Sequence, residues 1–90
     1  MLLLIWEQIL KNSNADKIVK GLVWDYYKKR NLDSLIRKVY VNRRETPKTI
    51  YIEARVTKKE ENMAQLIGRR GIHPNRIHKL FFSKWEVKII

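Results

Sequence analysis

Residues 64–80 read AQLIGRRGIHPNRIHKL, and this stretch decides how the rest of the chain can be arranged. The apolar residues between Met63 and Ile67 have helical spacing, and Gly68 is suited to end that helix. A second helix is expected soon after Gly71, because proline is tolerated in a first helical turn and Pro74 follows closely. The stretch therefore predicts two short helices joined by a four-residue loop.

The loop Gly68-Arg69-Arg70-Gly71 contains the residue types that a phosphate-binding turn requires. Glycine has no Cβ, so the two corners can adopt positive φ and allow a sugar-phosphate strand to approach closely. The N–H groups of the following helix favour an anion, and the two arginines add positive charge. Alone, the pattern is more typical of a helix C-cap followed by solvated arginines. Its position between two helices favours a binding loop.

Alternating residues predict strands on both sides of this helix pair, because successive side chains of a strand point to opposite faces. Residues 49–56 alternate most clearly, residues from about Leu35 to Asn42 have the same period, and residues 85–90 form a last strand. The apolar positions are Val39 and Val41 in the first strand, Ile50, Ile52, Ala54 and Val56 in the second, and Trp85, Val87 and Ile89 in the third.

Two details of the helix pair are also expected. Thr57 and Glu60 have capping-box spacing, which predicts the start of the first helix. The second helix is expected to turn Ile77, Leu80 and Phe81 inward.

Two more helices are predicted ahead of the first strand. Residues 2–11 place apolar side chains at helical spacing, and Asn12-Ser13-Asn14 interrupts that pattern. Ser13 with Asp16 then has capping-box spacing, and a second helix continues to about Arg30. Its apolar stripe consists of Ala15, Ile18, Val19, Leu22, Val23 and Tyr26. The predicted order is α-α-β-β-α-α-β.

Length and charge restrict the function classes. The chain has 90 residues, with 20 Lys and Arg against 9 Asp and Glu and a net charge of +11. Such a chain supports one domain and no deep catalytic cavity, because about 60% of the unfolded surface is buried at this size. The excess positive charge favours a polyanion, nucleic acid first. The basic character is concentrated in residues 35–90, with fourteen basic and five acidic side chains, against six and four in residues 1–34.

One residue type and several motifs are missing from the sequence, and their absence restricts the expected location and chemistry. The sequence has no cysteine, which excludes disulfides and fits a cytoplasmic protein. The opening MLLLIW run reaches Glu7 and Gln8 long before the roughly 18 apolar residues of a membrane span, so no membrane association is expected. No catalytic Ser-His-Asp arrangement or metal-ligand spacing is present, and we expect neither an enzyme nor a cofactor.

The strand at 49–56, the two helices around Gly68-Arg69-Arg70-Gly71 and the strand at 85–90 resemble the βααβ core of a KH domain. The additional helix and strand precede this core, as in the type II arrangement. Within that group, AQLIGRRGIHPNRIHKL followed by WEVKII is similar to the KH repeats of NusA-type transcription factors. The resemblance implies an α+β fold with a three-stranded mixed sheet packed on helices, a KH-like core at 35–90, and N-terminal helices at 1–34 within the same single domain.

The resemblance also implies a function: non-enzymatic binding of single-stranded nucleic acid, with RNA preferred, in transcription or RNA regulation. KH domains grip about four nucleotides, with the GxxG loop on the backbone and the bases on an apolar groove. Gly68 and Gly71 would form the corners of the loop, with Arg69 and Arg70 touching phosphate. The other residues expected at the site are Ile67 and Ile72 bordering the groove, Arg76 at the next phosphate, and His73 and Lys79 nearby.

Several side chains have simpler interpretations beside a binding role. His73 and His78 are the only imidazoles, and hydrogen bonding of His73 to phosphate or base competes with an ordinary surface position. Trp24 lies off the apolar stripe among lysines, where packing is favoured over base stacking. Tyr51 is expected to be an ordinary strand residue.

Two other functions remain open on the sequence. The basic helix from Ala15 to Arg30 could enter the major groove of duplex DNA, against which Asp16, Asp25 and Asp33 argue. The chain could instead be a protein-interaction or assembly subunit whose loop does not bind nucleic acid. The apolar face of residues 2–10 supports the latter, because either the core of the domain or a second copy or partner protein must cover it.

Overall fold

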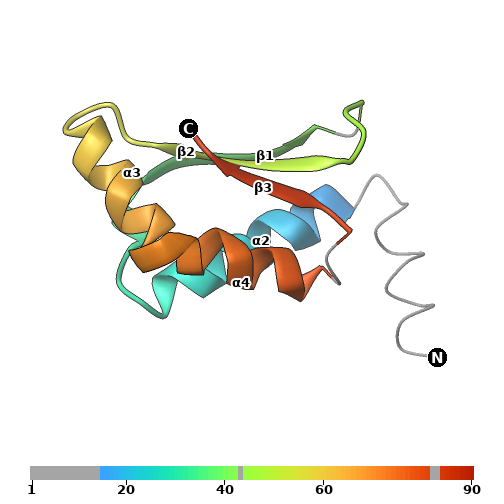
Figure 1. Ribbon diagram of the computed structural model, residues 1–90, viewed down its shortest axis with the longest axis horizontal. Helices are drawn as coiled ribbons and strands as arrows, with labels where there is room; N and C mark the ends of the chain where they lie inside the picture. Colours follow the sequence, from blue (N-terminus) through green and yellow to red (C-terminus); the bar gives the residue numbers. More distant parts are fainter. Residues whose placement is uncertain (1–14, 43, 82–83) are drawn as a thin grey trace.

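A three-stranded sheet with helices on one of its faces forms the architecture (Figure 1). The computed structural model describes residues 15–42, 44–81 and 84–90. Its helices and strands are α2 (Ala15–Lys28), β1 (Ile36–Asn42), β2 (Thr49–Ala54), α3 (Lys59–Ile67), α4 (Ile72–Leu80) and β3 (Glu86–Ile89), with 3-10 turns η1 (Asp33–Leu35) and η2 (Arg69–Gly71). The predicted α+β class and this order of elements are confirmed, whereas the helix predicted over residues 2–11 lies outside the described residues.

The sheet is mixed, with β2 in the centre. β1 runs antiparallel to β2, with Val39 opposite Ile52, and β3 runs parallel to β2, with Val87 opposite Ile50. A parallel neighbour requires a crossover, which the α3–loop–α4 segment supplies. The crossover therefore places the Gly68–Gly71 loop between two helices packed on the same face of the sheet.

The core lies between the inner face of the sheet and the three helices. β2 contributes Ile50 and Ile52, both fully buried. Each helix turns apolar residues at helical spacing toward them. These are Val19, Val23, Tyr26 and Tyr27 from α2, Leu66 from α3, and Ile77 with the following Phe81 from α4. Trp24 packs against the edge of this core, which confirms the packing interpretation of that residue.

The start of α3 differs from the prediction. Val56 is 69% exposed, because β2 ends at Ala54 and the chain turns. The residue before α3 is Lys58 in the left-handed conformation (φ 57°), with no side-chain cap, so the capping box at Thr57 and Glu60 is wrong. The Asn62 side chain instead holds the preceding turn, donating to the carbonyl oxygens of Arg55 (3.1 Å) and Thr57 (2.8 Å).

The buried faces of α2 and α4 are also rotated relative to the prediction. Ile18 and Leu22 are 41% and 37% exposed, whereas Tyr27 is fully buried. Leu80 is 47% exposed, since Ile77 and Phe81 already occupy the core-facing side of the second helix. Ile18 and Leu22 on α2 and Leu80 on α4 are thus exposed to solvent.

Candidate nucleic-acid interface

The backbone of the loop between α3 and α4 has the predicted glycine corners. Gly68 ends α3 at φ 74° and ψ 176°, and Gly71 precedes α4 at φ 68° and ψ 29°. Between them Arg70 also adopts the left-handed conformation, at φ 58°. The loop is closed by a hydrogen bond from the Gly71 N–H to the Gly68 carbonyl oxygen, at 3.2 Å. Three closely spaced bends therefore produce a tight turn, and Arg69 and Arg70 are both exposed on it.

The two glycines are required for different reasons. A Cβ on Gly68 would lie 2.7 Å from Cδ2 of His73 and 2.8 Å from Cγ2 of Ile72, so no side chain fits there. A Cβ on Gly71 would have no atom within 4 Å, and only its positive φ favours glycine. Gly68 is therefore a position of close packing, and Gly71 is a position of backbone bending.

The His73 side chain packs between α2 and the loop. Its Nδ1 lies 2.8 Å from the hydroxyl of Tyr26, and its ring makes edge-on contacts with the rings of Tyr26 and Tyr27. Burial lowers the pKa of His73, and the positive charges of Arg30 and Arg76 lower it further. The lowered pKa favours the neutral imidazole, and the half-buried ring packs between α2 and the loop. Contact of His73 with phosphate or base stays a prediction, and the sequence did not show that Tyr26, 47 residues away, would be its partner.

A surface hollow of about 510 Å³ lies over the loop. Arg69, Arg70, Ile72 and Asn75 line it. Two guanidinium groups and an amide are suitable donors for a phosphate, and the half-buried Ile72 supplies an apolar side. The structure thus brings together the predicted residues Arg69, Arg70 and Ile72, while Ile67 lies half-buried at the end of α3, next to Gly68.

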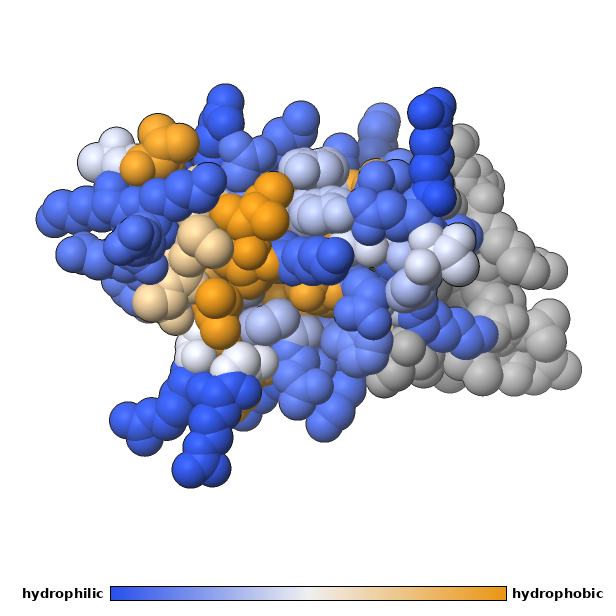
Figure 2. Space-filling view, turned by 45° about the horizontal axis from the view of Figure 1, so that its top comes forward, coloured by the Kyte–Doolittle hydropathy of each residue, from blue (hydrophilic) through white to orange (hydrophobic). Residues whose placement is uncertain are grey.

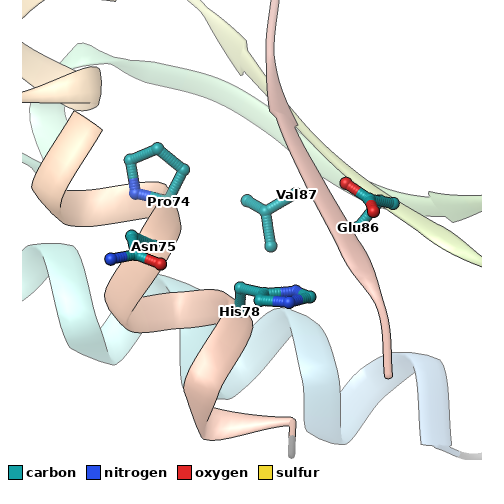
Figure 3. A pocket seen from close by; sticks show the side chains of 5 residues that line it. All are labelled: Pro74, Asn75, His78, Glu86 and Val87. Atoms are coloured by element: carbon teal, nitrogen blue, oxygen red, sulfur yellow. The ribbon is translucent and has the colours of Figure 1, made fainter. Parts of the chain in front are cut away.

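A second hollow, of about 210 Å³, lies between α4 and β3 (Figure 3). Pro74, Asn75 and His78 line it from α4, and Glu86 and Val87 line it from β3, with Val87 pointing toward the helix. Asn75 lines both hollows, so the space at the loop continues along this side of α4. Sequence reasoning missed Asn75 and Val87 as site residues, although the alternation in the last strand already placed Val87 on the inner face.

Polar groups are available at the second hollow. Nδ1 of His78 contacts the carbonyl oxygen of Trp85. A carbonyl oxygen only accepts, so Nδ1 carries the hydrogen of this contact, and Nε2 is the ring nitrogen left for a ligand. The N–H groups of Glu86 and Ile90 donate toward β2, at 2.9 Å each, so by alternation the backbone groups of Val87 turn toward the outer edge of the sheet. Hydrogen-bonding groups and an apolar side chain thus adjoin one small space.

Arg76 and Lys79 belong to a different surface. Pro74 and His78 occupy one flank of α4, and Arg76 and Leu80 occupy the opposite flank, because residues four apart share a helix face. There Arg76 and Lys79 line a groove with α2. The structure therefore separates these two cations from the α4–β3 hollow.

The exposed surface combines apolar and hydrophilic side chains. Figure 2 shows an apolar patch at the centre and left of the view, bordered by hydrophilic side chains that project outward. Within the described ranges, no three His, Cys, Asp or Glu side chains gather to hold a metal ion. No helix in those ranges has the length and apolar character needed to cross a bilayer.

Comparison with known proteins gives no match. No family model matches this chain, and neither a curated protein nor a solved structure matches it significantly.

Proposed function

We propose that this chain is a non-enzymatic module that binds single-stranded nucleic acid through the Gly68–Gly71 loop, in a type II KH-like fold. The order α2-β1-β2-α3-α4-β3 supports the fold assignment, because the two helices around the loop connect the parallel strands β2 and β3. The observation that carries the function is the loop itself, which has a positive φ at both glycines and two exposed arginines between them.

The geometry suggests how a strand would lie. A phosphate would occupy the hollow at Arg69 and Arg70, where backbone and side chain leave room for close approach. The next base would lie in the hollow between α4 and β3, against Val87 and beside His78. Unpaired bases are bound in this manner, by an apolar surface together with hydrogen bonds to their edges, whereas bases stacked in a duplex have no access to such a narrow space.

The remaining parts of the proposal have separate support. The preference for RNA and a role in transcription or RNA regulation rest on the resemblance to NusA-type KH repeats alone. The high positive charge supports a polyanionic partner of either sugar chemistry. A cytoplasmic location remains the expectation from the lack of cysteine.

Reversal of charge at the loop tests the proposal. Arg69→Asp with Arg70→Asp keeps both glycines, and we expect binding of fluorescent single-stranded RNA to fall by at least roughly tenfold, because charged hydrogen bonds to phosphate are lost. Circular dichroism and melting should be unchanged, since both side chains are exposed. Fluorescence anisotropy gives the affinities.

Lys58→Asp with Lys59→Asp is the matched control. It changes the net charge by the same amount at the other end of α3 and should have a much smaller effect. Equal losses in the two double variants would show attraction by overall charge without a site. Competition by duplex DNA that exceeds that by a single strand of the same length would favour the basic helix of the alternative interpretation. An affinity of the loop variant equal to that of the wild type would contradict the proposal.

A further inference from the structure

A groove between α2 and α4 lies on the flank of α4 opposite the α4–β3 hollow. It has a volume of about 510 Å³, and neither of the two hollows described above includes it. Leu22 and Leu80 line it with their exposed apolar side chains, at 37% and 47% exposure. Four cations and a single carboxylate are also part of its lining, namely Lys29, Arg30, Arg76, Lys79 and Asp25. Its chemistry is therefore cationic with an apolar end.

The single carboxylate in the groove does not neutralise this charge. Asp25 lies 3.3 Å from Lys29, and both side chains are well exposed, at 57% and 72%. A solvent-exposed pair of this kind contributes little stability, so it is easily rearranged by a ligand. The two arginines and Lys79 add three further positive charges to the lining. A polyanion is consequently the ligand class that fits.

Arg30 is held in place before any ligand arrives. Its Nη1 donates to the carbonyl oxygen of Tyr26 at 2.7 Å, and its guanidinium carbon lies 3.7 Å from the centroid of the Tyr26 ring. A guanidinium fixed by an aromatic ring and a carbonyl loses less conformational freedom on binding than an unrestrained side chain does. Its remaining N–H groups suit two oxygens of one phosphate, and its plane suits stacking by a base.

The groove is connected to the loop through a short series of contacts. Tyr26, which Arg30 covers, is hydrogen-bonded to His73, and His73 packs directly against Gly68. Both Arg30 and Arg76 are close enough to His73 to lower the pKa of its imidazole. Arg30 is thus linked to Gly68, at the start of the loop, through Tyr26 and His73.

We infer that the α2–α4 groove, centred on Arg30, binds the sugar-phosphate backbone of the same single strand beyond the nucleotides held at the loop. The inference rests on the proposed function and extends its footprint from the loop onto α2. The apolar end at Leu22 and Leu80 would cover a sugar or base. An acidic protein segment would share the charge but not the connection to the loop, so the nucleic acid is favoured.

Oligonucleotides of different length test the inference. For wild type, we expect a 12-nucleotide RNA to bind more tightly than a 4-nucleotide RNA, in fluorescence anisotropy and competition. Lys29→Gln with Arg30→Gln should reduce affinity for the longer RNA by roughly tenfold, since two phosphate contacts are lost, and leave the shorter within about twofold. The slope of log affinity against log salt for the longer RNA should decrease by about 1.4, at about 0.7 per phosphate contact.

Two single variants keep the test decisive. The Lys29 side chain is well exposed, so Lys29→Gln should leave the fold intact. If Arg30→Gln destabilises the domain, Lys29→Gln alone should still produce about half of the change in the salt slope expected for the double variant. Asp25→Asn removes the carboxylate from the groove and should act in the opposite direction, strengthening binding of the longer RNA only.

The outcomes separate the two claims. Failure of the wild type to bind either RNA overturns the proposed function and the inference with it. Loop-dependent binding whose gain with length is the same in the wild type, Lys29→Gln, the double variant and Asp25→Asn overturns the inference alone.

Discussion

The Tyr26 hydroxyl lies 2.8 Å from Nδ1 of His73, and this contact joins the end of α2 to the first turn of α4. Because the ring of His73 also packs against Gly68, the position of the loop depends on a helix 47 residues away in the sequence. α2 therefore does more than cover the sheet, since it fixes the surface from which Arg69 and Arg70 project.

The three glycines of the chain should respond differently to alanine. Gly68→Ala should destabilise most, because its φ and ψ of 74° and 176° are nearly restricted to glycine and a Cβ would meet His73. Strain of about 1–3 kcal/mol is expected, plus the displacement of that ring. Gly71→Ala should cost about 1 kcal/mol, because only its left-handed backbone is affected. Urea denaturation followed by circular dichroism measures both.

Gly21→Ala is the internal control for this series. Gly21 lies within α2, and a Cβ added there would have no atom within 4 Å, so alanine should stabilise by about 0.5–1 kcal/mol through helix propensity. Equal effects of alanine at 68 and 71 would show that the contact with His73 does not restrict the loop.

His73 should make the stability of the domain depend on pH. Burial and the nearby Arg30 and Arg76 lower its pKa in the folded state, below the ordinary 6.5. The folded state then binds fewer protons than the unfolded state, so the contribution of neutral His73 is complete above pH 6.5 and is lost as the pH falls through the lowered value. We expect the free energy of unfolding to decrease between pH 7 and pH 5.

His73→Gln tests the origin of that dependence. Glutamine keeps a polar side chain near Tyr26 but does not titrate, so the decrease toward pH 5 should become shallower than in the wild type. Denaturation curves at several pH values give the two slopes. Parallel slopes would mean that other groups cause the acid sensitivity and that His73 is not the titrating residue.

Local patterns predicted most of the fold. The alternation around Ile50 and Ile52 identified the central strand, and glycine at 68 and 71 identified the loop, because these features depend on near neighbours. The conformational requirement at both glycines was also readable from sequence, since few other residues favour positive φ.

The errors concern side chains whose partners are distant or irregular. Val56 continued the alternation of β2, yet Asn62 binds the backbone of Arg55 and Thr57 and holds the chain in a turn that no repeating pattern encodes. The hydrogen bond between His73 and Tyr26 was not predicted either, because these residues are 47 apart in the sequence. A periodic pattern predicts which residues share a face of one helix or strand. The conformation at these positions depends on contacts between two segments of the chain.

Asn62 should be important for the turn before α3. The residue is 8% exposed and donates to the carbonyl oxygens of Arg55 and Thr57. Asn62→Ala should destabilise by about 1 kcal/mol, near the lower end of the range for lost hydrogen bonds, because water can reach the exposed turn. Asn62→Asp should cost more, since it places a carboxylate against two carbonyl oxygens.

Thermal and urea unfolding would measure both changes at Asn62. Gln65→Ala is the matched control on the exposed face of α3 and should change stability by less than about 0.5 kcal/mol. If Asn62→Ala were as mild as this control, the two hydrogen bonds would not hold the turn.

Tyr51 should control the ionisation of Glu45 on the outer face of the sheet. The Tyr51 hydroxyl donates to Oε1 of Glu45, and Asn42 Nδ2 donates to the same oxygen at 3.0 Å. The hydrogen bond from Tyr51 is the largest cause of the lowered pKa of Glu45, followed by that from Thr49, and Lys88 contributes by its charge. Tyr51→Phe should therefore raise the pKa of Glu45 toward its ordinary value.

The reciprocal change and a control complete this test. The same hydrogen bond raises the pKa of Tyr51, so Glu45→Gln should lower it. Tyr40→Phe keeps the ring that stacks on Tyr51 at 5.1 Å and should leave the titration of Glu45 unchanged. NMR titration of the Glu45 carboxyl carbon gives the pKa in each variant. Because a lowered folded pKa stabilises the domain above the ordinary value, Tyr51→Phe should also weaken the loss of stability on acidification. Identical Glu45 titration curves in the wild type and Tyr51→Phe would show that the hydroxyl does not hold this carboxylate.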